Sequence, residues 1–155
     1  MTGPARGVLK LDEQLCFALY SASRLVTKSY RPLLDRLDLT YPQYLVLMVL
    51  WEASSEGTDA LTVGQVSQRL MLDGATMTPL LRRLEQRGFI DRRRAVEDQR
   101  SVLVSLTPRG LELENEAMQI PAALMCGREH QFAALLELRD KVRDFVAEMN
   151  AAAGD

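Results

Sequence analysis

The segment from residue 62 to residue 107 constrains the fold more than any other part of the chain, because it predicts four elements in a fixed order. The first helix, TVGQVSQRLML, begins with Thr62 and Gln65 at capping-box spacing. The second, within ATMTPLLRRLEQRG, has apolar residues at helical spacing and ends near Gly88, a residue type favoured just past a helix end. Two extended segments follow, FIDRRR and SVLVSLT, joined by AVEDQR.

The start of the second helix has two interpretations. Asp73 can cap it directly after the turn at Leu72, and Thr78 with Pro79 can equally form an N-cap and N1 pair. With either start, a helix, a turn, a helix and a basic β-hairpin follow one another. This order is typical of a winged helix-turn-helix.

The neighbouring segments predict further helices. TYPQYLVLMVLWEA has Pro42 near its start and apolar residues on nearly every side, which predicts a central buried helix. Upstream, apolar residues at three- and four-residue spacing predict a helix from about Asp12 to the low thirties, which Pro32 ends or kinks. Downstream, a helix starts at Thr107-Pro108 and is interrupted at Pro121, and a last amphipathic helix covers about 129–149.

The predicted fold is therefore mainly α with a small β-hairpin wing, in a single domain of 155 residues. Residues of about 40–107 form the expected DNA-binding lobe, and about 10–38 and 108–150 form flanking helices. These flanking helices have no core of their own to bury. A second copy of the chain is the simplest cover for their apolar faces, so we expect a homodimer.

Composition narrows the class of protein. The chain has no apolar run long enough to cross a membrane, and its start, MTGPARGVLKLDEQ, lacks a secretory h-region. We therefore expect a cytoplasmic protein with reduced thiols. Cys16 and Cys126 lie far apart, and His130 is the only histidine, so we expect neither a permanent disulfide nor a metal site, and no cofactor.

The charge is segregated along the chain. The net charge is −2, yet residues 82–100 contain seven arginines against four acids, and residues 111–155 contain nine acids against four bases. An arginine run is often only a solvated face. Here it lies on the two elements of a winged helix that enter the DNA grooves, which favours an interface with double-stranded DNA.

Particular side chains are expected at this interface. Thr76 and Thr78 lie near the start of the second helix, where hydroxyls can reach bases or phosphates. Asp98 lies two residues before Arg100 at the hairpin tip, where a carboxylate can hold a guanidinium pointing into a narrow minor groove. The full predicted set is Thr76, Thr78, Arg82, Arg83, Arg92, Arg93, Arg94, Asp98 and Arg100.

Cys16 has two interpretations, an inert buried thiol or a reactive one. Tyr20 lies at i+4 on the same helix face, close enough to influence the thiol. Tyr30 has nearly the same angular position but lies about 21 Å further along the axis, so it can reach Cys16 only from a partner chain. Phenol hydroxyls that donate to sulfur favour the thiolate, the form that attacks peroxides.

These residues carry a resemblance to a known family. QLCFALYSASR, TKSYRPLLDRLDLTYPQYLVLMVLWE, LDGATMTPLLRRLEQRGFI and RRRAVEDQRSVLVSLTPRG together resemble the multiple antibiotic resistance regulator (MarR) family, in its organic hydroperoxide resistance regulator branch. Asp98-Gln99-Arg100 marks the family, and Cys16 with Tyr20, Tyr30 and the Tyr41-to-Tyr44 stretch marks the branch. The connector SSEGTDAL is longer than is usual in the family.

The resemblance implies a homodimeric repressor that binds a pseudo-palindromic operator and whose Cys16 is oxidised by organic hydroperoxides. It also implies that Tyr30 and Tyr41 of the other subunit donate hydrogen bonds to the thiolate, with Tyr20 nearby. Arg100 would enter the minor groove, and the helix with Thr76, Thr78, Arg82 and Arg83 would read the major groove. Cys126 is either a resolving cysteine that forms a disulfide with Cys16 of the partner, or merely a buried residue.

Two other functions compete with this one. A regulator of the same fold can respond to a small aromatic ligand, or to another oxidant, in place of organic hydroperoxides. A thiol peroxidase with Cys16 as its catalytic residue lacks a nearby histidine or arginine to activate the thiol, and it leaves the winged helix without a role. We therefore expect a protein that is not an enzyme.

Overall fold

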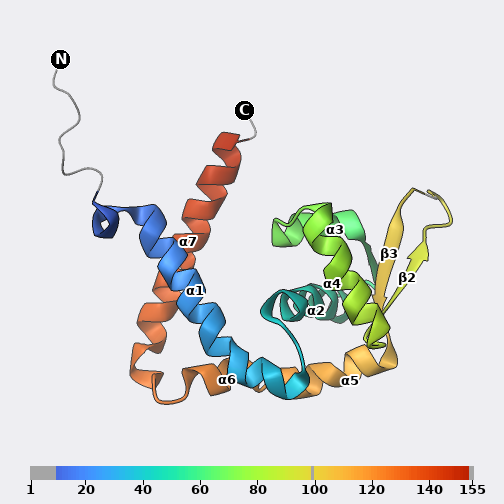
Figure 1. Cartoon of the computed structure of the whole chain (residues 1–155), viewed down its shortest axis with the longest axis horizontal. Coiled ribbons are helices and arrows are strands. Elements are labelled where there is room, and N and C mark those ends of the chain that lie inside the picture. The colour runs from blue at the N-terminus through green and yellow to red at the C-terminus, as the bar shows by residue number, and fades with distance from the viewer. Residues whose placement is uncertain (1–9, 99, 154–155) are drawn as a thin grey trace. The chain divides into compact units, whose positions relative to one another are not determined.

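The computed structural model describes residues 10–98 and 100–153, which form helices and one small sheet (Figure 1). The helices are α1 (Leu15–Leu34), α2 (Tyr41–Ser55), α3 (Val63–Leu70), α4 (Gly74–Gln86), α5 (Pro108–Ala117), α6 (Ile120–Met125) and α7 (Phe132–Ala153). The strands are β1 (Ala60–Thr62), β2 (Ile90–Arg94) and β3 (Val102–Leu106). The chain divides into one compact unit that ends at Ile120 and a second that begins at Pro121.

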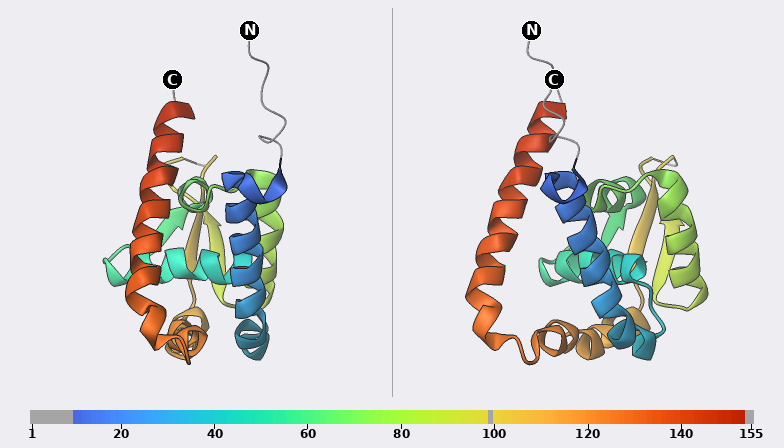
Figure 2. Two further views of the ribbon diagram at one scale, coloured as in Figure 1. Left: turned by 90° about the vertical axis from the view of Figure 1, so that its left-hand side faces the viewer. Right: turned by 60° about the vertical axis from the view of Figure 1, so that its left-hand side comes forward.

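The sheet is antiparallel with the order β1-β3-β2, and α4 packs beside β2 (Figure 2). The predicted hairpin of β2 and β3 is confirmed, with Arg92 opposite Val104. The third strand, β1, was not predicted: Ala60 and Leu61 lie in the connector SSEGTDAL, and Thr62 was expected only as the cap of the next helix. β1 has only three residues, too few to show an alternating pattern, and it forms by pairing with β3.

Side-chain caps begin the helices that build the lobe. The capping box of α3 is confirmed, since the Thr62 N–H donates to Gln65 Oε1 at 2.7 Å and the Gln65 N–H donates to Thr62 Oγ1 at 3.1 Å. For α4 the structure selects Asp73, whose Oδ1 accepts from the Thr76 N–H at 2.7 Å. Pro79 lies inside this helix, so the alternative start at Thr78 is wrong.

The flanking helices differ from their predicted limits by a few residues. α1 begins at Leu15 rather than at Asp12, because residues 11–13 form a short 3-10 turn. It continues past Pro32 to Leu34, where a second 3-10 turn follows. A proline in the last turn of a helix removes a single hydrogen bond, which explains why it does not end α1. The last helix, α7, runs from Phe132 to Ala153, so it begins three residues later and ends four residues later than expected.

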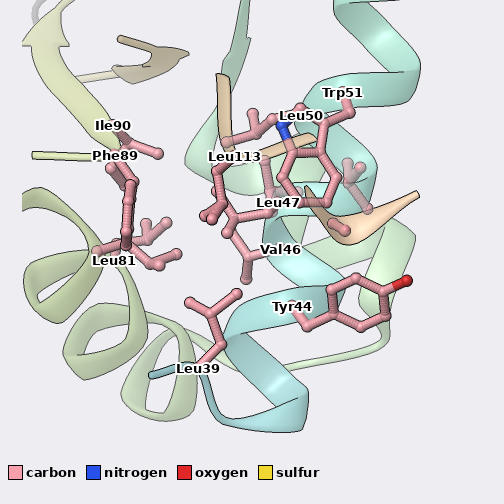
Figure 3. Packing of buried hydrophobic residues seen from close by; sticks show 14 of the residues in the cluster. Leu39, Tyr44, Val46, Leu47, Leu50, Trp51, Leu81, Phe89, Ile90 and Leu113 are labelled. Atoms are coloured by element: carbon pink, nitrogen blue, oxygen red, sulfur yellow. The ribbon is translucent and has the colours of Figure 1, made fainter. Parts of the chain in front are cut away.

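The core of the first unit is built around α2, as its apolar sequence predicted. In Figure 3, side chains of α2 face Leu81 of α4, Phe89 and Ile90 at the start of β2, and Leu113 of α5. Trp51 is buried, and its indole N–H donates to the carbonyl of Gly110 at 2.9 Å. This bond ties α2 to the first turn of α5 and satisfies the one polar atom of a large apolar side chain.

The flanking helices α1 and α7 bury far fewer residues in the single chain than α2 does. Leu34 is the only buried residue of α1, and no residue described in α7 is buried. Apolar side chains on α1 remain exposed, among them Leu15 at 57% and Leu25 at 65%. Within residues 10–98 and 100–153, no helix combines the length and the apolar character needed to span a membrane.

Candidate nucleic-acid interface and thiol site

The outer face of α4 is held toward solvent by a fully buried inner face. Met77, Leu81 and Leu84 are at most 1% exposed and anchor the helix on the core. Arg82 and Arg83 lie on the opposite side and are exposed, as the helical spacing predicted. Thr76 and Thr78 are also exposed, although the Thr78 hydroxyl donates to the Gly74 carbonyl at 2.7 Å.

The chain turns from α4 into the wing at Gly88. Gly88 has φ +72°, a conformation that side chains disfavour, and its N–H donates to the Glu85 carbonyl at 2.8 Å. The N–H of Phe89 donates to the Leu84 carbonyl at 3.1 Å, which completes a Schellman motif. This turn confirms the prediction for Gly88 and places β2 directly beside α4.

The tip of the wing is organised by Asp98. Its carboxylate accepts from the backbone N–H of Arg100 at 3.0 Å and from the Ser101 hydroxyl at 2.7 Å. These bonds, first the Ser101 hydroxyl and then the Arg100 N–H, lower the pKa of Asp98. The expected contact of Asp98 with the Arg100 guanidinium is therefore corrected: the carboxylate holds the backbone, and the Arg100 side chain is exposed. Gln99 lies outside the described residues.

The three arginines of β2 differ from one another. Arg92 is half-buried and forms an ion pair with Glu85 of α4, in which Nε donates to Oε2 at 2.9 Å. This hydrogen bond lowers the pKa of Glu85. Arg93 and Arg94 are exposed. Sequence spacing does not predict the pairing of Arg92 with Glu85, since the two residues are seven apart and lie on different elements. A DNA contact for Arg92 stays a prediction.

A groove of about 410 Å³ lies between α4, the wing and the start of α3. It brings together three of the predicted DNA-binding residues, Thr78, Arg92 and Arg100. The lining also includes Thr62 and Gly64 at the N-terminus of α3, where the helix dipole favours anions. Thr76, Arg82, Arg83, Arg93, Arg94 and Asp98 do not line this groove.

Cys16 is exposed near the start of α1 and is a free thiol in the single chain. The Tyr20 ring stacks near Phe17 at 6.4 Å between centroids, and its hydroxyl accepts from Arg24 Nη1 at 3.4 Å. Tyr20 lies four residues after Cys16 on α1, but the Tyr20 hydroxyl is hydrogen-bonded to Arg24. Cys126 follows α6 in the second unit and is likewise a free, exposed thiol.

Tyr30 and Tyr41 lie together at the junction of α1 and α2. Their ring centroids are 5.0 Å apart, and Tyr44 lies 5.9 Å from Tyr30. Burial raises the pKa of all three tyrosines, so their hydroxyls stay protonated and can donate at neutral pH. Tyr44 was not among the predicted site residues; its spacing of three from Tyr41 on one helix was the available signal.

A helix, a turn, a recognition helix and a three-stranded sheet with a basic wing define a winged helix-turn-helix protein. Comparison with known proteins identifies the family. The model of the family described as transcriptional regulator SarA/Rot matches residues 28–117. The organic hydroperoxide resistance transcriptional regulator of Bacillus subtilis (strain 168) is 50% identical over 117 residues, 76% of each chain.

Solved structures agree with this result. A structure of reduced AbfR bound to DNA is 31% identical, with a TM-score of 0.68 over 88% of this chain and 96% of the other. A disulfide-formed structure of AbfR, a Staphylococcus epidermidis protein, is 30% identical with a TM-score of 0.63 over 88% and 92%. MarR of E. coli, at 24% identity and a TM-score of 0.67 over 83% and 96%, supports the fold alone. The chain belongs to the MarR/SarA family of transcriptional regulators and is similar to its organic hydroperoxide resistance regulators, which confirms the resemblance.

Proposed function

We propose that the protein is a homodimeric repressor that releases its operator DNA when an organic hydroperoxide oxidises Cys16. The observation that carries this proposal is the separation of two chemical groups along α1. Cys16 is exposed near one end, and the protonated hydroxyls of Tyr30 and Tyr41 gather at the other. The part of α1 between Cys16 and Tyr30 is about 21 Å long. The Cys16 thiol can therefore meet these hydroxyls only if they belong to another chain.

A two-fold dimer joins these groups. In such a dimer each contact occurs twice, so Cys16 of one subunit approaches Tyr30 and Tyr41 of the other. The exposed apolar side chains of α1, including Leu15 and Leu25, supply the surface that the second copy covers. Hydrogen bonds from the two phenols would stabilise the Cys16 thiolate, the reactive form.

The DNA-binding part of the proposal rests on the exposed cations. Arg82 and Arg83 on α4 are free of the core and suit the major groove, and Arg100 at the wing tip suits the minor groove. A dimer would present two such lobes to a pseudo-palindromic operator, with half-sites about one turn of DNA apart. Relatives in the family include AbfR, for which a DNA-bound form is solved.

The redox step follows from thiol chemistry. The Cys16 thiolate attacks one oxygen of the hydroperoxide, the O–O bond breaks, and the alcohol leaves after taking up a proton, which gives a sulfenic acid. The thiol of Cys126 from the other subunit then attacks this sulfur, and water leaves as a disulfide forms. A bond between subunits would change the spacing of the two lobes and so weaken DNA binding.

A second candidate function is favoured by one groove. About 960 Å³ of space lies between α1 and the start of α2, lined by three cations, Arg24, Lys28 and Arg31, and by Tyr41. Cations beside an aromatic ring suit an aromatic acid, which would make the protein a regulator that responds to a small ligand.

One experiment tests the proposal and separates it from the second candidate. Operator binding is measured for the wild-type protein and for Cys16→Ser, before and after one equivalent of an organic hydroperoxide. We expect the wild type to leave the DNA and Cys16→Ser to stay bound, with Cys126→Ser as the matched control that still forms the sulfenic acid. Release of Cys16→Ser by peroxide would contradict the proposal. Non-reducing mass analysis of the same samples shows whether a Cys16–Cys126 linkage joins two chains.

A further inference from the structure

We infer that Arg87 is a positioning residue that couples α1 to the recognition helix, because its guanidinium joins the C-terminal end of α4 to the turn that ends α1. The predicted DNA-binding residues do not include Arg87, although it lies within the same arginine-rich segment. The effect of Arg87 on the response to oxidation rests on the proposed function. The effect of Arg87 on DNA binding by the reduced protein does not depend on it.

One side of the guanidinium binds the turn after α1. Nη1 donates to the Asp38 carbonyl, and Nη2 donates to the Leu37 carbonyl at 3.2 Å. Nη2 also lies 3.1 Å from the Asp38 carboxylate, but that carboxylate is 90% exposed, so solvent weakens the ion pair. The two carbonyls are therefore the main acceptors, and they belong to the negative end of a 3-10 turn that continues α1.

The backbone of the same turn has an unusual conformation at Asp38. Asp38 has φ +53°, one of two non-glycine residues at positive φ within residues 10–98 and 100–153. Such a conformation is disfavoured for a residue with a side chain, and surrounding contacts must hold it in place. The bonds from Arg87 are such contacts, so the conformation of the turn and the position of Arg87 depend on each other.

The other side of Arg87 belongs to the DNA-binding lobe. Arg87 is the C-cap of α4, and its guanidinium lies over the buried ring of Phe89, 4.8 Å from the centroid. Arg109 of α5 contacts the same ring at 4.9 Å and donates to the Arg87 carbonyl at 2.9 Å. The backbone of Arg87 is thus fixed to α4 and α5 while its side chain reaches α1.

This arrangement needs an arginine. A guanidinium offers five N–H donors in a planar fork, which allows one side chain to bind two carbonyls and still stack on a ring. A lysine keeps the charge but has a single nitrogen and no planar face. Because α1 is a continuous helix from Leu15 to Leu34, a movement at Cys16 is carried to this turn and through Arg87 to α4.

The test compares Arg87→Lys with Arg109→Lys. The second variant changes the other arginine on Phe89 and its hydrogen bond to the Arg87 carbonyl, but it leaves the Arg87 guanidinium in place to bind the turn. In reduced protein, we expect Arg87→Lys to weaken operator binding about tenfold more than Arg109→Lys, with both dimers intact. Equal DNA affinities would overturn the positioning role, whether or not peroxide acts on the wild type.

The redox arm measures the ratio of operator affinities before and after oxidation. We expect about a hundredfold ratio for the wild type and less than about tenfold for Arg87→Lys, at an unchanged rate of Cys16 oxidation. A ratio for Arg87→Lys equal to that of the wild type would overturn the coupling. If the wild type itself shows no release, the proposed function fails and the reduced-state comparison decides the inference alone.

A measurement on the wild type covers the case in which Arg87→Lys does not fold. Amide hydrogen exchange is followed in residues 35–39 and 84–89 before and after oxidation. Coupling through Arg87 predicts that the exchange of both segments changes together, while residues 43–51 in the core stay protected. A change in one segment without the other would overturn the inference.

Discussion

The winged-helix lobe and the helix α1 use their apolar residues in opposite ways. In the lobe, Val46, Leu47 and Met77 are completely buried, and charged side chains cover the outside. On α1, apolar side chains such as Leu15 and Leu25 face solvent, and Cys16 is exposed among them. The lobe therefore has a well-packed core of its own, whereas most apolar side chains of α1 remain exposed in the single chain.

The arginines show a related difference within the lobe. Arg87 and Arg92 are committed to contacts inside the chain, with the turn after α1 and with Glu85. Arg82, Arg83 and Arg100 are exposed on the face predicted to meet DNA. A count of arginines in the sequence cannot separate these two groups, because the separation depends on which residue each side chain meets in the folded chain.

The largest effect on the lobe is expected from Gly110→Val. A Cβ at this position would lie 2.0 Å from the carbonyl oxygen of Phe89, which is backbone and cannot move aside. We expect a loss of more than about 4 kcal/mol of unfolding free energy, or no folded lobe. Gly74→Ala is the matched control, since its Cβ would meet no atom within 4 Å. Urea unfolding measures both, and a stable Gly110→Val would contradict the packing at Trp51 and Gly110.

A pair of leucine substitutions compares the two regions directly. Leu81→Ala removes a side chain that is 1% exposed and should cost about 2–5 kcal/mol of unfolding free energy. Leu25→Ala removes one that is 65% exposed and should leave the lobe within about 0.5 kcal/mol of its stability while it weakens dimer association. Chemical denaturation and analytical ultracentrifugation separate the two quantities. Equal effects of both changes on unfolding would remove the distinction between the regions.

The exposed arginines are tested by Arg100→Ala. We expect a loss of about 1–3 kcal/mol in operator binding and a smaller dependence of affinity on salt, with the stability of the lobe unchanged. Arg69→Ala is a matched control, because Arg69 is exposed and paired with Glu52 on α2. Fluorescence anisotropy at several salt concentrations gives the affinities, and an unchanged affinity for Arg100→Ala would refute the wing contact.

A small pH effect is expected from the Glu85–Arg92 pair. The pKa of Glu85 is lowered in the folded chain, so the pair stabilises the fold above the ordinary glutamate pKa of 4.5 and loses this effect as the pH falls through the lowered value. Because both side chains are about one-third exposed, the contribution is under about 1 kcal/mol. Unfolding free energies of the wild type and Glu85→Gln should differ at pH 7 and converge as the pH falls through the lowered pKa of Glu85. A constant difference would contradict the ionic origin.

Much of the fold could be predicted from local patterns. The capping box at Thr62, the apolar helix α2 and the turn at Gly88 depend on neighbouring residues, and the sequence shows them directly. β1 and the Glu85–Arg92 pair could not be predicted, because each forms between segments that the sequence keeps apart. At the site, the spacing of Cys16 and Tyr30 excludes a contact within α1, but the neighbours of Tyr30 on α2 appear only in the folded chain.

Mixed dimers show whether two chains together build each thiol site. Cys16→Ser and the double variant Tyr30→Phe, Tyr41→Phe are mixed, and the rate of sulfenic acid formation at Cys16 is measured against each parent. We expect the mixed dimer to regain fast oxidation, because the intact Cys16 of one chain meets the intact tyrosines of the other. A mixed dimer as slow as the double variant alone would show that the tyrosines do not act on Cys16 across the dimer.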